Sequence, residues 1–353
     1  MARSQPGLIR QQAQACAELG SPMYGELLDR LADDLEAGGP TESVLRGHED
    51  DPGPSGLALR LAGSIHRLVL DGRATELERF YPTTGGTWST AGVDAVLDFL
   101  HRREDDVRPL LDQPPQTNEV GRSAALLGGL LRLVARHRLS VRLFEIGASG
   151  GLNLYADRFR YLDDAGGDWG DAESPVLLQG AWQGSSLPLG EQVVVVERGG
   201  CDVSPVDVTT EDGRLTLMSY VWPDMTARHA RLSGAIDLAR REPVRVERAG
   251  AAAYVDGLDL HEGHLTVLWH SVMWQYAPRD QQERVTARLA ELGERATDRR
   301  PLVHLFAEPT RRTPEDRHRF WVVAERWPDG VREYLGQMAP HGLPVTWESP
   351  ATG

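Results

Sequence analysis

The chain contains no lysine, because all 38 basic residues among its 353 residues are arginine. This absence excludes the Schiff-base lysine of pyridoxal phosphate enzymes and the lysine of a phosphate-binding P-loop. Acidic residues outnumber basic ones, and the formal net charge is −14. A charge of this sign argues against a protein that binds nucleic acid through its phosphates.

Cysteine is also scarce, since Cys16 and Cys201 are the only two. They support neither a disulfide framework nor a cysteine metal site, and the histidines lack the H-E-x-x-H spacing of a zinc site. No apolar run approaches the roughly 20 residues that span a bilayer. The first residues lack the apolar core of a signal peptide. We therefore expect a cytoplasmic protein with no metal site and no membrane partner.

The first third of the chain has the pattern of helices. Apolar residues recur at three- and four-residue spacing up to about residue 138, between punctuating segments such as "AGGP" and "DPGPSG". No convincing strand precedes Val141. The sequence thus predicts an all-helical N-terminal region over residues 1–116, followed by a helix at 117–138 that leads into a different kind of fold.

Beyond Val141, apolar runs alternate with helical segments. The runs are "VRLFEI", "QVVVVE", "PVRVER", "LTVLWH" and "PLVHLFAE". This alternation predicts an α/β fold over residues 117–353, with a Rossmann-like, mostly parallel sheet and helices on both faces. The segment near 160–190 interrupts the first crossover, and we expect it to form an inserted hairpin.

The turn "GASGG" at 147–151 fits two chemistries. It matches the G-x-S-x-G elbow that presents a nucleophilic serine in hydrolases. With Glu145 before it, the turn also matches a loosened form of the glycine turn that cradles a nucleotide cofactor. A hydrolase elbow follows a central strand with several strands upstream, whereas this turn follows the first predicted strand. We favour the cofactor interpretation and keep, as the alternative, a serine hydrolase in which Ser149 acts with His270 or His341.

Other reactive side chains follow the predicted strands. The carboxyl ends of parallel strands share one edge of the sheet, and ligands bind at that edge. Asp202 comes after the second strand, where a carboxylate can accept hydrogen bonds from both ribose hydroxyls; the alternative is an Asx turn. His270 and Glu308 end the fourth and fifth strands. We predict both as catalytic, His270 as a proton acceptor and Glu308 as a partner for an amine, with a buried core histidine as the alternative for His270.

Further residues are expected around a substrate at this edge. The helix at 117–138 joins the first strand through a short connection, so its first turn, capped by Thr117, should lie near the carboxyl ends. Arginine side chains near this edge are suited to bind a carboxylate of the substrate. The alternative role for Asp224 is to cap the N-terminus of a helix. The predicted substrate-binding residues are Asn118, Glu119, Arg122, Trp222, Asp224, Arg228, Trp274 and His341.

Several quoted motifs together resemble known families. "EIGASGG", "GCDVSP" and "LTVLWHSVMWQY" resemble the motifs of class I S-adenosylmethionine (SAM)-dependent methyltransferases. "QTNEVGR", "EIGASGGLNL", "VWPDMTARHARL" and "WHSVMWQY" resemble an uncharacterised bacterial domain-of-unknown-function family over nearly the whole chain. The methyltransferase resemblance implies methyl transfer to a small molecule, with SAM held by Glu145, Gly147, Ser149, Gly151 and Asp202.

The chain departs from the methyltransferase pattern at two places. Ser149 stands where the third glycine of the turn is usual, and "AGAAAYV" lacks the acidic residue that often follows the third strand. A non-catalytic ligand-binding protein with a degenerate methyltransferase fold is therefore a further alternative.

Overall fold

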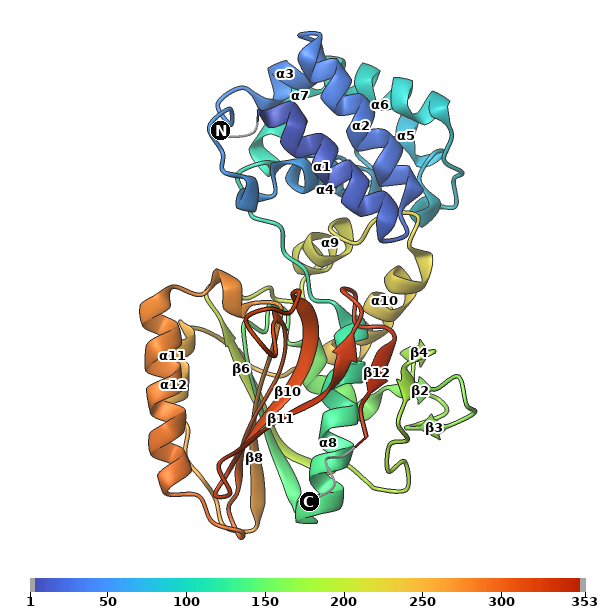
Figure 1. Ribbon diagram of the computed structural model, residues 1–353. Helices are drawn as coiled ribbons and strands as arrows, with labels where there is room; N and C mark the ends of the chain where they lie inside the picture. Colours follow the sequence, from blue (N-terminus) through green and yellow to red (C-terminus); the bar gives the residue numbers. More distant parts are fainter. Residues whose placement is uncertain (1–3, 350–353) are drawn as a thin grey trace. The chain divides into compact units, whose positions relative to one another are not determined.

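The structure is a computed structural model that describes residues 4–349 (Figure 1). It contains two compact units. The helical unit consists of Met1–Thr117 and Thr210–Ala230, and the sheet unit consists of Asn118–Thr209 and Arg231–Gly353. The sequence predicts a helical region over 1–116, and it does not predict that the later segment 210–230 joins these helices.

The helical unit contains no strand among its described residues. Proline in the first turn of its first three helices suits the backbone angle of a helix start and needs no N–H partner there. Its helices are α1 (Gln5–Glu18), α2 (Pro22–Glu36), α3 (Pro40–Leu45), α4 (Leu57–Leu70), α5 (Thr75–Glu78), α6 (Thr90–Arg102), α7 (Glu104–Val107) and α9 (Glu211–Ser219). Short 3₁₀ turns lie at Gly53–Ser55, Pro82–Thr84 and Arg108–Leu110, and α10 (Thr226–Arg241) begins in this unit and ends in the sheet unit.

A nine-stranded sheet forms the centre of the sheet unit, in the order β5-β12-β11-β10-β9-β8-β1-β6-β7. The five strands that the sequence predicts are present and run parallel: β1 (Ser140–Ile146), β6 (Val195–Asp202), β7 (Val246–Arg248), β8 (His264–Ser271) and β9 (Leu302–Thr310). The remaining strands of this sheet are β5 (Trp182–Gly184), β10 (Arg319–Trp327), β11 (Val331–Met338) and β12 (Val345–Trp347). The sheet is thus mixed but mostly parallel, as the sequence predicts.

The C-terminal strands were not predicted. β10 pairs antiparallel with both β9 and β11, and β12 pairs antiparallel with β11. Proline and glycine in "WPDG" mark the turn between β10 and β11, where Gly330 has a φ of 65° that suits glycine. Such a turn signal between two strand-like segments is typical of a β-hairpin.

Helices cover both faces of the sheet. α8 (Ser123–His137) packs on one face, where Gly128 and Gly129 let it approach Trp347 and Leu305 closely. On the other face, α11 (Ala251–Asp256) and α12 (Arg279–Glu294) lie side by side over the apolar side chains of β1 and β8 (Figure 1). None of the described helices has the length and apolar character that crossing a membrane requires.

The first crossover, which connects β1 to β6, contains no α-helix. It begins with two fused 3₁₀ turns at Leu152–Arg158 and continues into a three-stranded sheet of β2 (Arg160–Leu162), β3 (Asp168–Trp169) and β4 (Leu177–Gln179). β2 pairs antiparallel with β3, as in a hairpin, and parallel with β4. β5 then leaves this small sheet and pairs with β12 at the edge of the large one. The inserted segment is therefore more than the hairpin that the sequence predicts.

Candidate functional site

The order of the strands reverses direction at β1. The chain continues from β1 to β6 on one side, and it later returns to place β8 on the other side. At such a point the loops diverge, and ligands of α/β proteins bind outside the carboxyl ends of the strands. We call this end of β1, β6, β8 and β9 the carboxyl edge.

The turn after β1 has an unusual backbone. Gly147, Ser149 and Gly151 all have positive φ, at 66°, 52° and 72°. Glycine adopts this conformation freely, whereas a serine in it is strained. The N–H of Ser149 donates to Oδ2 of Asp202 at 2.9 Å, and the N–H of Ser204 donates to Oδ1 at 2.8 Å. Asp202 therefore joins the ends of β1 and β6 and shapes an Asx turn, which is its alternative role.

The two glycines of this turn make room for side chains of the chain itself. A Cβ atom at Gly147 would lie 2.8 Å from Cγ of Met273, and one at Gly151 would lie 2.7 Å from Cγ2 of Val246. No acidic residue follows β7 at 249–251 to meet an adenine. The side chain of Met273 thus lies against Gly147 in this structure.

Glu145 ends β1 as a fully buried carboxyl group, 2% exposed. Nδ2 of Asn153 donates to its Oε1 at a long 3.5 Å, and Oγ of Ser123 donates to Oδ1 of Asn153 at 2.8 Å. Within the described part of the chain, no hydrogen bond of normal geometry reaches Oε2 of Glu145, although Trp269 is its neighbour on β8. Burial raises the pKa of Glu145 to about 8, and the charge of Asp202 raises it further. The side chains of Asn153, Arg122 and Trp269 lower this pKa, but burial outweighs them. The carboxyl is thus largely protonated at neutral pH and can donate a hydrogen bond.

The helix start that precedes β1 lies at the carboxyl edge, as the antiparallel arrangement predicts. Oδ1 of Asn118 accepts from the N–H of Leu152, in the segment that follows the glycine turn, at 2.9 Å. NH1 of Arg122 donates to the carbonyl of Ser271, at the end of β8, at 3.4 Å. Residues 118–122 therefore contact both the segment after β1 and the end of β8.

Glu119, rather than the predicted Thr117, caps this helix. Its Oε1 accepts from the N–H of Gly121 at 3.1 Å, because the helix begins with a 3₁₀ turn at Val120–Arg122 and not at residue 118. Its Oε2 lies 3.8 Å from Nδ1 of His341. The structure thus brings His341, from near the C-terminus, close to Glu119. Both residues are among the predicted substrate-binding residues.

The two predicted catalytic residues contact each other. Nδ1 of His270 lies 2.8 Å from Oε1 of Glu308, and both side chains are buried. The same oxygen accepts from the N–H groups of Met273 and Trp274, at 2.9 and 3.2 Å. The imidazole of His270 is stacked against Trp274, with ring centroids 5.0 Å apart, and against Phe306, at 5.3 Å. Aromatic rings therefore hold the imidazole in one plane.

A second histidine, which the sequence analysis missed, continues this contact. Nε2 of His304 lies 3.0 Å from Nε2 of His270, and Nδ1 of His304 lies 2.9 Å from Oε2 of Glu325. Glu325 in turn pairs with Arg332. The signal was present in "HLFAE", since residues two and four apart on a strand share a face, which places His304 on the same face of the sheet as Glu308.

These last residues line a pocket of about 250 Å³ between α12 and the hairpin of β10 and β11. Leu289 and His304 are buried in it, whereas Val331 and Arg332 are exposed, so the pocket is open to solvent. The pocket therefore gives the buried histidines a polar connection to the surface.

Three predicted substrate-binding residues belong to the helical unit. Oδ1 of Asp224 accepts from Oγ of Ser21 at 2.6 Å, and Oδ2 accepts from the N–H of Met23 at 3.0 Å. Asp224 thus helps to cap α2. Trp222 packs in the core of the helical unit, and the guanidinium of Arg228 lies 5.6 Å from the centre of its ring. Substrate contact by these three residues stays a prediction.

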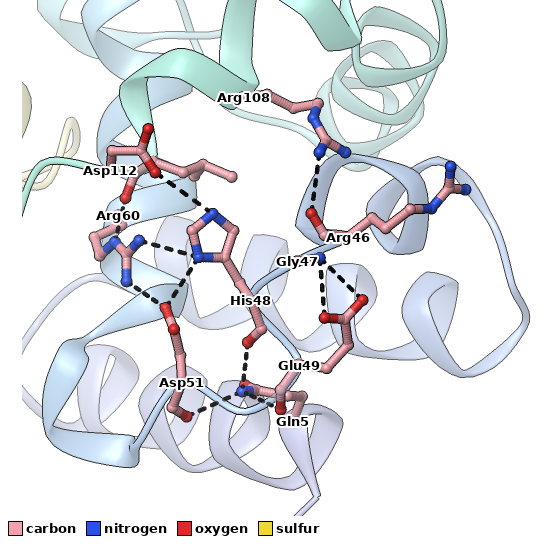
Figure 2. Close-up of polar contacts among 10 residues, drawn as sticks. Gln5, Arg46, Gly47, His48, Glu49, Asp51, Arg60, Arg108 and Asp112 are labelled. Carbon is pink, nitrogen blue, oxygen red and sulfur yellow. Dashed lines mark hydrogen bonds and ion pairs between the residues drawn. The ribbon is translucent and has the colours of Figure 1, made fainter.

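The helical unit has a polar cluster of its own (Figure 2). Oδ2 of Asp51 accepts from NH1 of Arg60 at 2.6 Å and lies 3.1 Å from Nδ1 of His48. Nε2 of Gln5 donates to three carbonyls of the same loop, including those of His48 and Asp51. The adjoining pocket is about 30 Å³, room for about one water molecule. This cluster anchors the loop after α3 to α1 and α4.

No three or more histidine, cysteine, aspartate and glutamate side chains within residues 4–349 are grouped so as to hold a metal ion. Neither the curated proteins nor the solved structures gave a match to the chain. One family model does match, over residues 7–347, and it covers segments of both units. The chain belongs to this family, which is described as an uncharacterized protein conserved in bacteria, DUF2332.

Proposed function

We propose that this protein is an enzyme that acts on a small molecule at the carboxyl edge, with Glu145 as the proton-transferring group. The observation that supports this is the state of Glu145: it is buried at the end of β1, its Oε2 lacks a normal hydrogen bond, and its pKa is raised to about 8. Buried polar atoms are nearly always paired, and strongly shifted carboxyl groups gather at catalytic sites. A substrate atom at Oε2 would supply the missing partner.

The neighbours of Glu145 suit this role. A carboxyl whose pKa lies near the working pH can both donate a proton and take it back. Asn153, fixed by Ser123, orients the carboxyl group. Arg122 contributes a positive charge that acts on Glu145 from the same edge. Such a charge favours a substrate that carries a carboxylate or phosphate.

Native mass spectrometry of freshly purified protein tests this proposal. We expect the wild type to carry a bound small molecule that Glu145→Leu, which has no polar atom to contact it, loses or binds far less. Glu283→Leu, on the exposed side of α12, is the matched control and should keep the ligand. Equal occupancy in wild type and Glu145→Leu would refute the proposed role of Glu145.

Methyl transfer from SAM is a second candidate, supported by the order of the parallel strands. β7-β6-β1-β8-β9 are the third, second, first, fourth and fifth parallel strands along the chain, which is the Rossmann order. The glycine turn after the first strand and Asp202 at the end of the second agree with it. Met273 against Gly147 weighs against it. Calorimetric titration with S-adenosylhomocysteine should show saturable binding that Asp202→Ala weakens; no binding at millimolar ligand removes this candidate.

Hydrolysis by Ser149 is supported by one observation, the strained φ of 52° expected of a nucleophile elbow. Both ring nitrogens of His270 are engaged by other side chains, which leaves His341 as the remaining proposed base. A fluorophosphonate probe that labels wild type but not Ser149→Ala would support this alternative. If no ligand binds and no probe reacts, the proposal becomes a non-catalytic protein with this fold.

A further inference from the structure

A continuous chain of polar contacts runs from the surface into the core of the sheet unit. It passes from Arg332 to Glu325, His304, His270 and Glu308, with 2.9, 3.0 and 2.8 Å for the last three contacts. The exposed fraction of the side chain is 49% at Arg332, 24% at Glu325, 8% at His304 and 2% at His270. This chain of contacts therefore begins at the open pocket and ends at the carboxyl edge.

The contact between the two histidines constrains where protons lie. Burial lowers the pKa of His304, although its hydrogen bond to Glu325 acts in the opposite direction. Burial alone would raise the pKa of Glu325, but His304 and Arg332 outweigh burial and hold this pKa below its usual value. At neutral pH, Nδ1–H of His304 thus donates to an ionised Glu325. The bare Nε2 of His304 can then only accept, so Nε2 of His270 must carry a proton.

The same reasoning continues to Glu308. With a proton on Nε2 of His270, its Nδ1 either accepts from a protonated Glu308 or donates to an ionised one. In both cases the pair holds one proton more than a neutral histidine and an ionised glutamate would. This proton lies next to Oε2 of Glu308, a buried atom that no hydrogen bond reaches within the described residues.

We propose that Glu308, His270, His304 and Glu325 form a proton relay between water in the pocket and the carboxyl edge. The relay spans four residues of β9, about 13 Å at the usual rise of a strand. What the protons serve rests on the proposed acid–base function at the carboxyl edge. The relay itself is a property of the ligand-free protein.

Each step conserves protons. A proton taken up at Oε2 of Glu308 leaves the proton shared between Oε1 and Nδ1 of His270 on Nδ1. The Nε2 proton of His270 passes to Nε2 of His304, whose Nδ1 proton passes to Glu325 and then to water. One proton enters and one leaves, and each ring accepts at one nitrogen and releases from the other. Stacking between Trp274 and Phe306 keeps His270 aligned for both transfers.

NMR of the full chain with ¹⁵N-labelled histidine tests the relay. We expect one protonated and one bare Nε2, with scalar coupling across the bond between His270 and His304. We also expect the Nε2 proton of His270 to exchange with water although it is buried. Glu325→Gln should slow this exchange about a hundredfold, the low end of what a positioned proton-transfer group contributes.

Glu333→Gln is the matched control, because Glu333 lies on the same hairpin but pairs with Arg326. It should leave the exchange unchanged. Unchanged exchange in Glu325→Gln would overturn the relay. If that variant does not fold, the wild type decides: two protonated Nε2 atoms, or a proton that exchanges only on unfolding, would overturn it. Because no ligand is used, a failure of the Glu145 proposal is seen separately, by mass spectrometry.

Discussion

At the scale of single residues, Glu145 is the most informative position. Its folded-state pKa of about 8 lies above the ordinary value of 4.5, so between these values the folded protein binds more protons than the unfolded chain. The free energy of unfolding therefore falls as pH rises through this range, and it is highest, with respect to this group, below the unfolded pKa.

Glu145→Gln should remove this pH dependence. The variant should match the wild type near pH 5 and become more stable than it toward pH 9, by on the order of a few kcal/mol. Denaturant unfolding at several pH values measures the difference. Glu283→Gln should run parallel to the wild type throughout. A wild-type advantage that is constant with pH would show that Glu145 is ionised at neutral pH.

Ser149 offers a second test at this scale, of backbone strain. With a φ of 52°, a residue with a Cβ pays a cost that glycine avoids. Both Ser149→Gly and Ser149→Ala remove the hydroxyl, so the difference between their free energies of unfolding measures the cost of the backbone conformation alone. Ser149→Gly should be more stable than Ser149→Ala by about 1 kcal/mol in chemical denaturation. The reverse order would mean that the left-handed conformation is not populated.

At the scale of elements, the turn after β1 and the loop after β8 depend on each other. Gly147→Ala should destabilise the protein by about 2 kcal/mol or more, because its Cβ meets Met273 and its φ is positive. Adding Met273→Ala removes the collision. A double-mutant cycle should give a coupling of about 1 kcal/mol. Additive effects would show that the loop holding Met273 is already displaced from the turn, which would favour a cofactor there.

At the scale of the whole molecule, the helical unit needs a segment from beyond the first six strands. Trp222 packs in its core, Asp224 caps α2, and the carbonyl of Ser219 lies 3.0 Å from Nδ1 of His66. A chain of residues 1–117 alone should therefore lose cooperative thermal unfolding by circular dichroism. The same chain joined to 210–230 through a flexible linker should regain it. Cooperative unfolding of 1–117 alone would contradict this.

The extent of successful prediction differs between elements for a physical reason. β1, β8 and β9 were visible in the sequence, because a buried parallel strand is a continuous apolar run. β6 is mostly exposed or half-buried, and the apolar run that predicted it, at 192–197, overlaps only its first residues. β10 was not predicted, although the centre of "RFWVVAERW" is also an apolar run. At the site, His270 and Glu308 were found from strand ends, whereas His304, midway along β9, was not.

The sequence by itself determined the helical first third, the parallel strands and the convergence of Glu145, Ser149 and Asp202 at one edge. These depend on local periodicity and on strand ends, which neighbouring residues specify. Only the tertiary structure decided that Met273 fills the space above Gly147, that Glu145 is buried without a full set of partners, and that two histidines meet. Those depend on packing between segments far apart in the chain, which no local pattern encodes.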